Sequence, residues 1–296
     1  CLFILFKFLL KNKNSVVFAF QANIYCIILC KLLNIRIIVR SNSSPSGWYH
    51  NIFKKILYKK IISLADKVIV NSLEFKKQME KQFHINVKCI FNPLNSKYII
   101  QQSKRGKFDR FFKTKNKTLK LINLGRFTDQ KNQILILKAV EILKKNTDLR
   151  LIILGRGIEK EKMQKYIINH NLKKYVKLKN FTDNPFRLIK ESDIFILSSN
   201  YEGLPNVLLE AACLKKLIIS TKCPTGPKEI LLNGKGGILF KKNKKNELSD
   251  SLNSFDNLSV DKKNLMRLNS KKNCIKYSLL RHHNSLKKIL YFNEKY

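Results

Sequence analysis

Short apolar runs alternate with longer amphipathic stretches along residues 1–100 of the chain. Runs rich in β-branched and aromatic residues predict strands at 16–20, 35–40, 67–72 and 87–94. Helical spacing of the apolar positions predicts helices at 25–34, 49–62 and 73–83. This alternation is typical of a parallel sheet whose strands are connected by helices. Residues 1–100 are therefore predicted to form one α/β domain.

A polar and basic stretch at 101–117 interrupts the alternation and is predicted to be a linker. Strand-like runs then return at 119–124, 149–155, 176–181, 193–199 and 216–221. Helices are predicted between them at 131–145, 159–171, 185–191 and 205–214. This order predicts a second, doubly wound α/β domain over 118–270, with a C-terminal helix at 271–296. Two such domains would face a cleft at the carboxyl ends of their strands, where folds of this kind bind ligands.

The chain is strongly basic, with 59 Lys and Arg against 20 acidic residues and a formal net charge of +39. Such an excess suits nucleic acid, an anionic membrane surface or a phosphorylated small molecule. Lys, Asn and Ile are abundant everywhere, however, which also fits a simple codon bias. No nucleic-acid-binding motif accompanies the charge, so nucleic acid is not expected as a partner. The Lys-rich helices at 49–62 and 73–83 suit an anionic membrane, or are merely solvated.

The cysteines and the apolar runs give information on the cellular compartment of the protein. The seven cysteines are scattered without a CxxC pair, which predicts reduced thiols in a reducing compartment. The start CLFILFKFLL has no basic region before it and supports a signal peptide only weakly. Polar residues break the run at 16–39, and a membrane span needs about 20 apolar residues in succession. The sequence therefore predicts a cytoplasmic protein, at most peripheral on the inner face of the membrane.

The stretch INLGRFTDQKN (122–132) is the first candidate for chemistry. A strand is predicted to end at Leu124, Gly125 permits a tight turn, and a helix follows. Arg126 and Lys131 would then lie beside the unpaired N–H groups of a helix N-terminus. A guanidinium and an ammonium at such a corner suit a diphosphate, although each could equally be a solvated surface cation.

The stretch EGLPNVLLE (202–210) is the second candidate. Glu202 is predicted to lie in the loop after the strand at 193–199, with Pro205 at the first helical position. The free N–H groups of residues 203–207 would favour a phosphate or sugar oxygen. Glu210 is surrounded in sequence by apolar residues, and a buried carboxylate requires a partner. Vicinal hydroxyls, such as those of a ribose, would supply one.

The segment from Glu202 to Glu210 resembles the E-x7-E element of retaining nucleotide-sugar glycosyltransferases of the GT-B fold (family 4-like, glycosyl transferases group 1). Over about residues 119–240, three further stretches are similar to that family: GRFTDQKN (125–132), LIILGRG (151–157) and STKCPTGPKEIL (220–231). SNSSPSGWY (41–49) and NSLEFKKQME (71–80) are similar to its acceptor-side segments. The CPTGPKEIL version resembles bacterial enzymes that build lipopolysaccharide, capsule or lipid-linked glycans.

The resemblance implies two Rossmann-like domains: 1–100 on the acceptor side and 118–270 on the donor side, with the helix at 271–296 packing back on the former. It implies catalytic roles for Arg126 and Lys131 on the diphosphate and for Glu202 on the donor sugar. The remaining donor-binding residues that it implies are Gly125, Gly155, Gly157, Phe181, Thr182, Asp183, Gly203, Leu204, Pro205, Asn206 and Glu210. Glu210 would bind the ribose, and 181–183 would lie against the base. No metal or cofactor is implied.

The implied reaction is retaining transfer of a hexosyl or N-acetylhexosaminyl group from a nucleotide-diphosphate sugar, most simply a UDP-sugar. The acceptor would be a saccharide or lipid-linked molecule. The first domain departs from the family, because no strand and Gly-rich loop precede Val16, and about 60 to 90 residues of an ordinary domain are expected to be missing. His50 and His84 are the candidates for a first-domain histidine. A non-catalytic sugar-nucleotide-binding subunit, or an inactive fragment, is the alternative.

Overall fold

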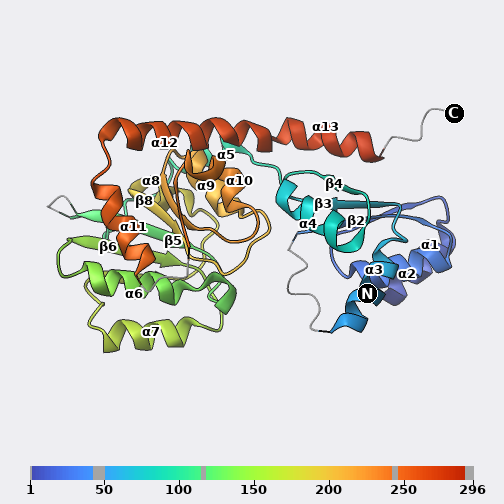
Figure 1. The fold of residues 1–296 in the computed structure, drawn as a ribbon, viewed down its shortest axis with the longest axis horizontal. Coiled ribbons are helices and arrows are strands. Elements are labelled where there is room, and N and C mark those ends of the chain that lie inside the picture. Colours follow the sequence, from blue (N-terminus) through green and yellow to red (C-terminus); the bar gives the residue numbers. More distant parts are fainter. Residues whose placement is uncertain (1, 43–50, 115–117, 242–245, 291–296) are drawn as a thin grey trace. The chain divides into compact units, whose positions relative to one another are not determined.

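The computed structural model describes residues 2–42, 51–114, 118–241 and 246–290. The chain divides into two compact units, one comprising the residues up to Asn92 and from Ser285 onward, the other Pro93–Asn284 (Figure 1). Each unit contains its own sheet, and all the strand pairings in both sheets are parallel. The predicted α/β fold with parallel sheets is confirmed.

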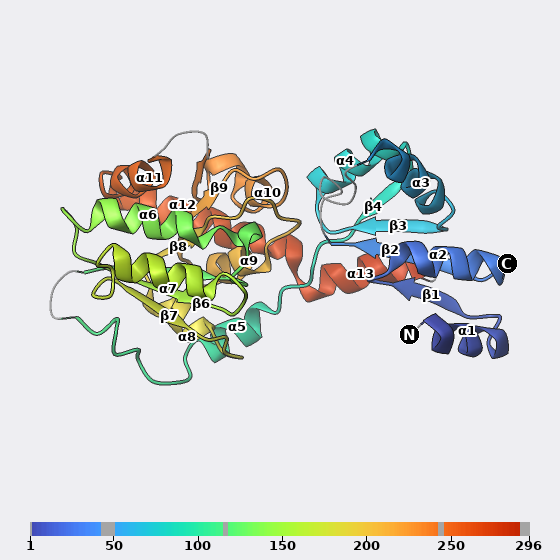
Figure 2. The same cartoon turned by 90° about the horizontal axis from the view of Figure 1, so that it is seen from below.

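The sheet of the first unit has the strand order β1-β2-β3-β4 (Figure 2). Its strands are β1 (Val16–Ala19), β2 (Arg36–Ser41), β3 (Lys67–Val70) and β4 (Val87–Cys89). The helices that alternate with them are α1 (Leu2–Lys11), α2 (Asn23–Leu32), α3 (Ile52–Ile62) and α4 (Leu73–Phe83). A crossover helix therefore connects each strand to the next, as the alternation of apolar runs predicts, and α1 precedes β1.

Successive residues of β2 and β3 point to opposite faces of the first sheet. Ile37 and Val39 belong to the apolar cluster formed with α1, α2, α3 and α4, whereas Ile38 belongs to a separate cluster. That second cluster contains the last residues of α13 (Leu279–Leu290), among them Leu286 and Ile289. Both faces of the sheet are thus covered, which explains why β2 and β3 have apolar residues at successive positions, 37–39 and 68–70.

The sheet of the second unit has the order β10-β9-β8-β5-β6-β7. Its strands are β5 (Leu119–Leu124), β6 (Leu149–Leu154), β7 (Val176–Lys179), β8 (Ile194–Leu197), β9 (Leu217–Thr221) and β10 (Ile238–Phe240). The chain moves from β5 toward β6 and β7, then returns to the other side of β5 with β8. The topological switch point therefore lies between β5 and β8, and ligands of doubly wound folds bind at this kind of position.

Helices cover both faces of the second sheet (Figure 1). One layer consists of α6 (Gln133–Leu143), α7 (Lys160–Asn169) and α11 (Glu247–Asp256). The other consists of α5 (Ser96–Gln102), α8 (Phe186–Glu191), α9 (Asn206–Cys213), α10 (Pro227–Ile230) and α12 (Val260–Asn273). Short 3₁₀ turns occur at η2 (Asp129–Lys131), η3 (Leu232–Gly234) and η4 (Cys274–Tyr277).

The structure differs from the sequence-based expectation at the predicted linker, 101–117. Its described residues belong to the second unit, which begins at Pro93. Phe112 is 2% exposed, Asp109 forms an ion pair with Lys179 of β7, and the N–H of Asp109 donates to a carboxylate oxygen of Glu191 at 3.0 Å. The charged contacts of Asp109 and the burial of Phe112 thus attach this segment to the second unit.

Several elements were not predicted from sequence. They are α1, α5, α10 and β10, and α9 begins at Asn206 and not at Pro205. Pro205 is the N-cap, with an extended ψ of 100°, so its ring precedes the helix. Across the described ranges, no helix has both the length and the apolar character needed to cross a bilayer.

Candidate functional site

Two corners meet at the switch point of the second sheet. One follows β5 and contains Gly125, Arg126 and Lys131; the other follows β8 and contains Ser199 and Glu202. Because β5 and β8 are adjacent and parallel, the residues after both strands lie at the same edge of the sheet. The carboxyl edge thus brings together residues that are 71 positions apart in sequence.

An ion pair between Lys131 and Glu202 joins the two corners. The ammonium of Lys131 donates to Oε1 of Glu202 at 2.5 Å, and only 15% and 7% of the two side chains are exposed. The hydroxyl of Ser199 donates to the same oxygen at 2.6 Å. The hydroxyl of Thr225 donates to the main-chain carbonyl of Glu202. Lys131 and Ser199 therefore hold the carboxylate of Glu202, and Thr225 holds its main chain.

Arg126 lies on the same corner but in a different environment. Its side chain is exposed, and its guanidinium donates to Oε1 of Gln130 at 3.3 Å. The amide of Gln130 donates to the carbonyl of Tyr201 at 3.1 Å, which connects this corner to the loop of Glu202. Among the residues that the structure describes, Arg126 has no carboxylate partner. Lys131 is therefore neutralised by Glu202, whereas the guanidinium of Arg126 remains available to an anion.

Glycines allow neighbouring turns to approach closely. The amide of Gly125 donates to the carbonyl of Leu154, and the amide of Phe127 donates to the carbonyl of Arg156 at 2.9 Å. A Cβ on Gly155 would collide with the carbonyl oxygen of Gly125, and Gly157 has a φ of +151°. The glycines of LIILGRG thus permit the turn after β6 to pack on the corner after β5. Whether they also admit a nucleotide stays a prediction.

The loop of Glu202 leads directly into α9. Gly203, Leu204 and Pro205 are buried, and Asn206 is exposed at the first helical position. A Cβ on Gly226 would collide with the carbonyl of Gly203, so the loop before α10 packs closely on this segment. The fold therefore holds the start of α9 rigidly, immediately after the residue that pairs with Lys131.

Glu210 lies about one turn along α9 from its first residue, Asn206, and is only partly exposed. Burial raises the pKa of its carboxyl group to about 7. Within the described ranges, the side chain of Glu210 forms neither a hydrogen bond nor an ion pair. The structure does not join it to the ion pair of Lys131 and Glu202. Its carboxyl group is thus largely withdrawn from water and has no partner among the described residues. Its role as a ribose ligand stays a prediction.

The loop after β7 is the most exposed part of the predicted site. Phe181 is 60% exposed, and the guanidinium of Arg156 lies over its ring at 5.7 Å from the centroid. The hydroxyl of Thr182 accepts from the amide of Asn184 at 3.4 Å, and Asp183 is exposed. The structure therefore places Phe181 beside the turn of LIILGRG, and among the described residues no hydrogen bond or ion pair connects 181–183 with Lys131 or Glu202.

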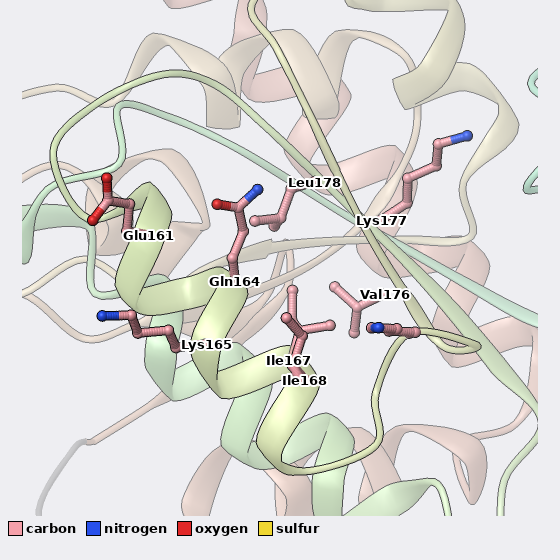
Figure 3. A pocket seen from close by; sticks show the side chains of 9 residues that line it. Glu161, Gln164, Lys165, Ile167, Ile168, Val176, Lys177 and Leu178 are labelled. Carbon is pink, nitrogen blue, oxygen red and sulfur yellow. The ribbon is translucent and has the colours of Figure 1, made fainter.

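Two cavities flank β7. One of about 520 Å³ includes Thr182 and Asn184, together with Arg105, Lys177, Lys179 and Arg187. The other, of about 610 Å³, lies between α7 and β7 and contains none of the predicted site residues (Figure 3). It is lined by Glu161, Gln164, Lys165, Ile167, Ile168, Lys173, Val176, Lys177 and Leu178. Neither cavity includes the ion pair at the switch point.

Sequence reasoning missed Ser199, Thr225 and Gln130, which support the ion pair. Single Ser, Thr and Gln residues carry no distinctive pattern, although Ser199 directly follows a predicted strand. Of the candidate histidines, His84 is the exposed residue that ends α4, and His50 lies outside the described residues. Residues 43–49 of the predicted acceptor-side segment also lie outside them.

Comparison with known proteins gives a consistent result. Residues 105–276 match the family model "Glycosyl transferases group 1". An uncharacterized glycosyltransferase of Methanocaldococcus jannaschii is 35% identical over 216 residues, which cover 68% of this chain and 53% of that protein. A Campylobacter jejuni protein is 28% identical over 228 residues, 74% of this chain and 60% of its own length. It is named N-acetylgalactosamine-N,N'-diacetylbacillosaminyl-diphospho-undecaprenol 4-alpha-N-acetylgalactosaminyltransferase. The chain thus spans little more than half the length of these relatives.

Solved structures show the same fold. A glycosyltransferase from Rickettsia africae superposes with a TM-score of 0.79 at 18% identity, covering 98% of this chain and 80% of that one. Anabaena HepE in complex with UDP-glucose superposes with a TM-score of 0.81 at 14% identity, covering 98% and 81%. At such low identity these matches support the fold alone, which is that of GT-B glycosyltransferase structures.

Proposed function

Because the chain belongs to the family of glycosyl transferases group 1, we propose that it transfers a sugar from a nucleotide-diphosphate donor to a saccharide or lipid-linked acceptor, with retention of anomeric configuration. UDP is the nucleotide that we propose, since solved relatives of the fold are bound to UDP or UDP-glucose. The relative from Campylobacter is named for a diphospho-undecaprenol substrate, which supports a lipid-linked acceptor in cell-surface glycan synthesis.

The observation that carries the proposal is the ion pair of Lys131 and Glu202 at the switch point, with Arg126 beside it. When a sugar leaves a nucleotide diphosphate, negative charge develops on the diphosphate. A preorganised ammonium and guanidinium lower the energy of that state, because they require no reorganisation at the moment of reaction. Lys131 would exchange part of its interaction with Glu202 for the diphosphate, and Glu202 would then accept hydrogen bonds from hydroxyls of the donor sugar.

Glu210 is the proposed ribose ligand. Its carboxyl group, withdrawn from water and without an internal partner among the described residues, would gain hydrogen bonds from a vicinal diol. We propose that the two cations and the helix start at Asn206 do the work that a metal would otherwise do, so that the reaction needs no metal or cofactor. Turnover would take place in the cytoplasm, with the protein peripheral on the inner face of the membrane where a lipid-linked acceptor is available.

The test is a transfer assay with the purified protein. UDP release and product formation are measured with UDP-glucose, UDP-N-acetylglucosamine and UDP-N-acetylgalactosamine, with and without EDTA, on saccharide and undecaprenyl-diphosphate-linked acceptors. The anomeric configuration of the product is read from NMR couplings. We expect turnover with at least one donor, a retained configuration, and loss of turnover in Lys131→Ala. Turnover within threefold of wild type in both Lys131→Ala and Glu210→Ala would refute the assigned roles.

Calorimetry with UDP separates the enzyme from a non-catalytic sugar-nucleotide-binding subunit. UDP binding with no turnover on any acceptor would favour the binding subunit. Binding to DNA or RNA with a steep dependence on salt would instead point to the basic surface as a nucleic-acid site.

A further inference from the structure

Arg40, in the sheet of the first unit, is a buried cation with no anionic partner in the part of the chain that the structure describes. It lies at the carboxyl end of β2, and only 4% of it is exposed. Its Nη2 donates to the carbonyl of Ile90 at 3.1 Å and to Oδ1 of Asn92 at 2.8 Å, and its Nε donates to Oδ1 of Asn42 at 3.2 Å. These acceptors are all neutral, and no described carboxylate forms an ion pair with Arg40.

A buried charge of this kind is costly. Removing a guanidinium from water is unfavourable unless an opposite charge compensates it, and neutral carbonyl groups do so only in part. In agreement, burial lowers the pKa of the Arg40 guanidinium. A structural role could be filled by a neutral side chain that makes the same hydrogen bonds. A buried positive charge with only neutral acceptors among the described residues therefore suggests an anion that is supplied from outside the protein.

A cavity gives Arg40 access to such a ligand. Its volume is about 260 Å³, and Arg40 is one of its lining residues. The other lining residues are Phe20, Gln21, Ala22, Asn23, Ile24, Tyr25, Ser41, Asn42 and Tyr58. The volume is sufficient for a phosphate group and part of an attached sugar. The cavity lies after β1 and β2, at the carboxyl edge where parallel sheets bind ligands.

Two further features of the cavity match a phosphate ester. Residues 23–25 begin α2, a helix of ten residues, and their N–H groups have no acceptor among the described residues. Such N–H groups attract an anion because the helix dipole is positive at this end. The carbonyl oxygen of the Asn23 side chain is buried and accepts no hydrogen bond from the described residues. It could accept one from a hydroxyl next to the phosphate.

We propose that this cavity of the first unit binds the phosphate group of a glycosyl phosphate, with the Arg40 guanidinium and the first N–H groups of α2 on the phosphate oxygens and the Asn23 side chain on an adjacent hydroxyl. The inference rests on the proposed function in one respect: the glycosyl phosphate would be the end of the acceptor. It names the acceptor class as an anionic saccharide phosphate or diphosphate, not a neutral sugar.

The experiment measures hydrogen–deuterium exchange of the purified protein, titrated with α-glucose 1-phosphate and separately with inorganic pyrophosphate. Saturating UDP is present to occupy the proposed donor site, and sodium chloride at equal ionic strength is the reference. Exchange is followed in peptides covering 20–26 and 36–42. We expect both phosphates to slow exchange in these peptides, whereas chloride has no effect. No slowing in the wild-type protein would overturn the proposal.

Variants make the assignment specific. Arg40→Gln should raise the half-saturating concentration of glucose 1-phosphate at least tenfold. Gln21→Glu should do the same, because it brings a carboxylate to the cavity from an exposed position, and it tests the idea even if Arg40→Gln does not fold. Arg36→Gln is the matched control, since it removes the same charge from the amino end of β2, and it should stay within twofold of wild type. Equal effects of Arg36→Gln and Arg40→Gln would overturn the proposal.

Vesicles distinguish a saccharide phosphate from a lipid headgroup. Phosphatidylglycerol vesicles that slow exchange in these peptides, while glucose 1-phosphate has no effect, would overturn the assignment in favour of a membrane contact. Phosphatidylcholine vesicles are the neutral control. Because the readout is binding, it does not depend on turnover. Exchange protection without transferase activity would contradict the proposed function alone, and activity without protection would contradict this site alone.

Discussion

The ammonium of Lys131 lies 2.5 Å from Oε1 of Glu202, and the two residues belong to the corners that follow the adjacent strands β5 and β8. Ser199 donates to the same carboxylate oxygen, so the negative charge is held by a cation and a hydroxyl. Both charges are largely shielded from water, and the loss of either would leave the other poorly solvated. The same pair therefore contributes to stability and keeps Lys131 positioned at the switch point.

Replacing Lys131 by Ala should reduce both stability and turnover. The free energy of unfolding should fall by about 3 to 5 kcal/mol, the usual cost of breaking a buried ion pair. UDP-sugar turnover should fall by about 100-fold or more, because a cation that stabilises the departing diphosphate is lost. Chemical denaturation and the UDP-release assay measure the two effects. Lys162→Ala is the control: its ion pair with Glu159 is exposed and should change neither quantity.

The double variant Lys131→Met/Glu202→Gln separates the two roles. It removes both buried charges, so stability should return most of the way toward wild type, since neutral replacement of a buried pair is often tolerated. Turnover should remain as low as in Lys131→Ala. Recovery of turnover together with stability would show that Lys131 acts only on the fold.

Arg126→Ala should leave stability unchanged and weaken UDP binding. Arg126 is exposed, and among the described residues its side chain donates to Gln130 alone, so the folded state loses little when this side chain is truncated. A charge-assisted hydrogen bond to a diphosphate contributes about 1.5 to 3 kcal/mol, which corresponds to about a 10- to 100-fold increase in the Kd for UDP. Calorimetry measures the Kd. Arg110→Ala, at another exposed position of the second unit, should stay within twofold.

Most strands could be predicted because the sheets are buried on both faces. A parallel strand such as β8 is an uninterrupted apolar run of buried residues, and it lies within the predicted range 193–199. β10 was missed because its three residues become a strand only through pairing with β9. The segment at 101–117 was predicted to be a linker because the partners of Asp109, Lys179 and Glu191, are distant in sequence.

The candidate site was predictable to the extent that topology determines it. Lys131 and Glu202 follow strands that a doubly wound sheet can place side by side, so their proximity follows from the element order. The supporting hydroxyls of Ser199 and Thr225 could not be predicted, because their donors and acceptors are set by loop conformation. The buried Arg40 was also missed, since an Arg at the end of an apolar strand has the sequence pattern of a surface residue.

Gly155→Ala should destabilise the second unit. A Cβ at this position would lie 2.9 Å from Cε1 of Phe127 and collide with the carbonyl of Gly125. Overpacking of this kind costs about 1 to 3 kcal/mol, because backbone must move to relieve it. Gly125→Ala is the matched control, since its Cβ would meet side-chain atoms and no backbone at ordinary contact distances, Lys131 at 3.4 Å and Nε2 of Gln133 at 3.6 Å. Equal loss of stability in the two variants, measured by thermal denaturation, would contradict this account of the turn.

Glu210 should make stability depend on pH. Burial raises the pKa of its carboxyl group to about 7 in the folded protein, whereas the pKa of Glu in the unfolded chain is about 4.3. Between these values the folded state binds more protons than the unfolded state. Its stability therefore falls as pH rises through this window and levels off above about pH 7. Glu210→Gln removes the effect, so the variant should match wild type at pH 4 and be more stable at pH 8.

The affinity for UDP should rise with pH, whereas the stability of the protein falls. If ribose hydroxyls donate to the Glu210 carboxylate, UDP binds the ionised form, and a folded pKa of about 7 makes that form scarce at pH 6. The Kd for UDP should then fall by about tenfold from pH 6 to pH 8 through this group. The terminal phosphate of UDP also has a pKa of about 6, so its ionisation contributes to the pH dependence of the Kd. The informative quantity is therefore the ratio of the wild-type Kd to that of Glu210→Gln at each pH. A ratio that does not change with pH would exclude Glu210 as the ribose ligand, even if the variant is more stable at pH 8.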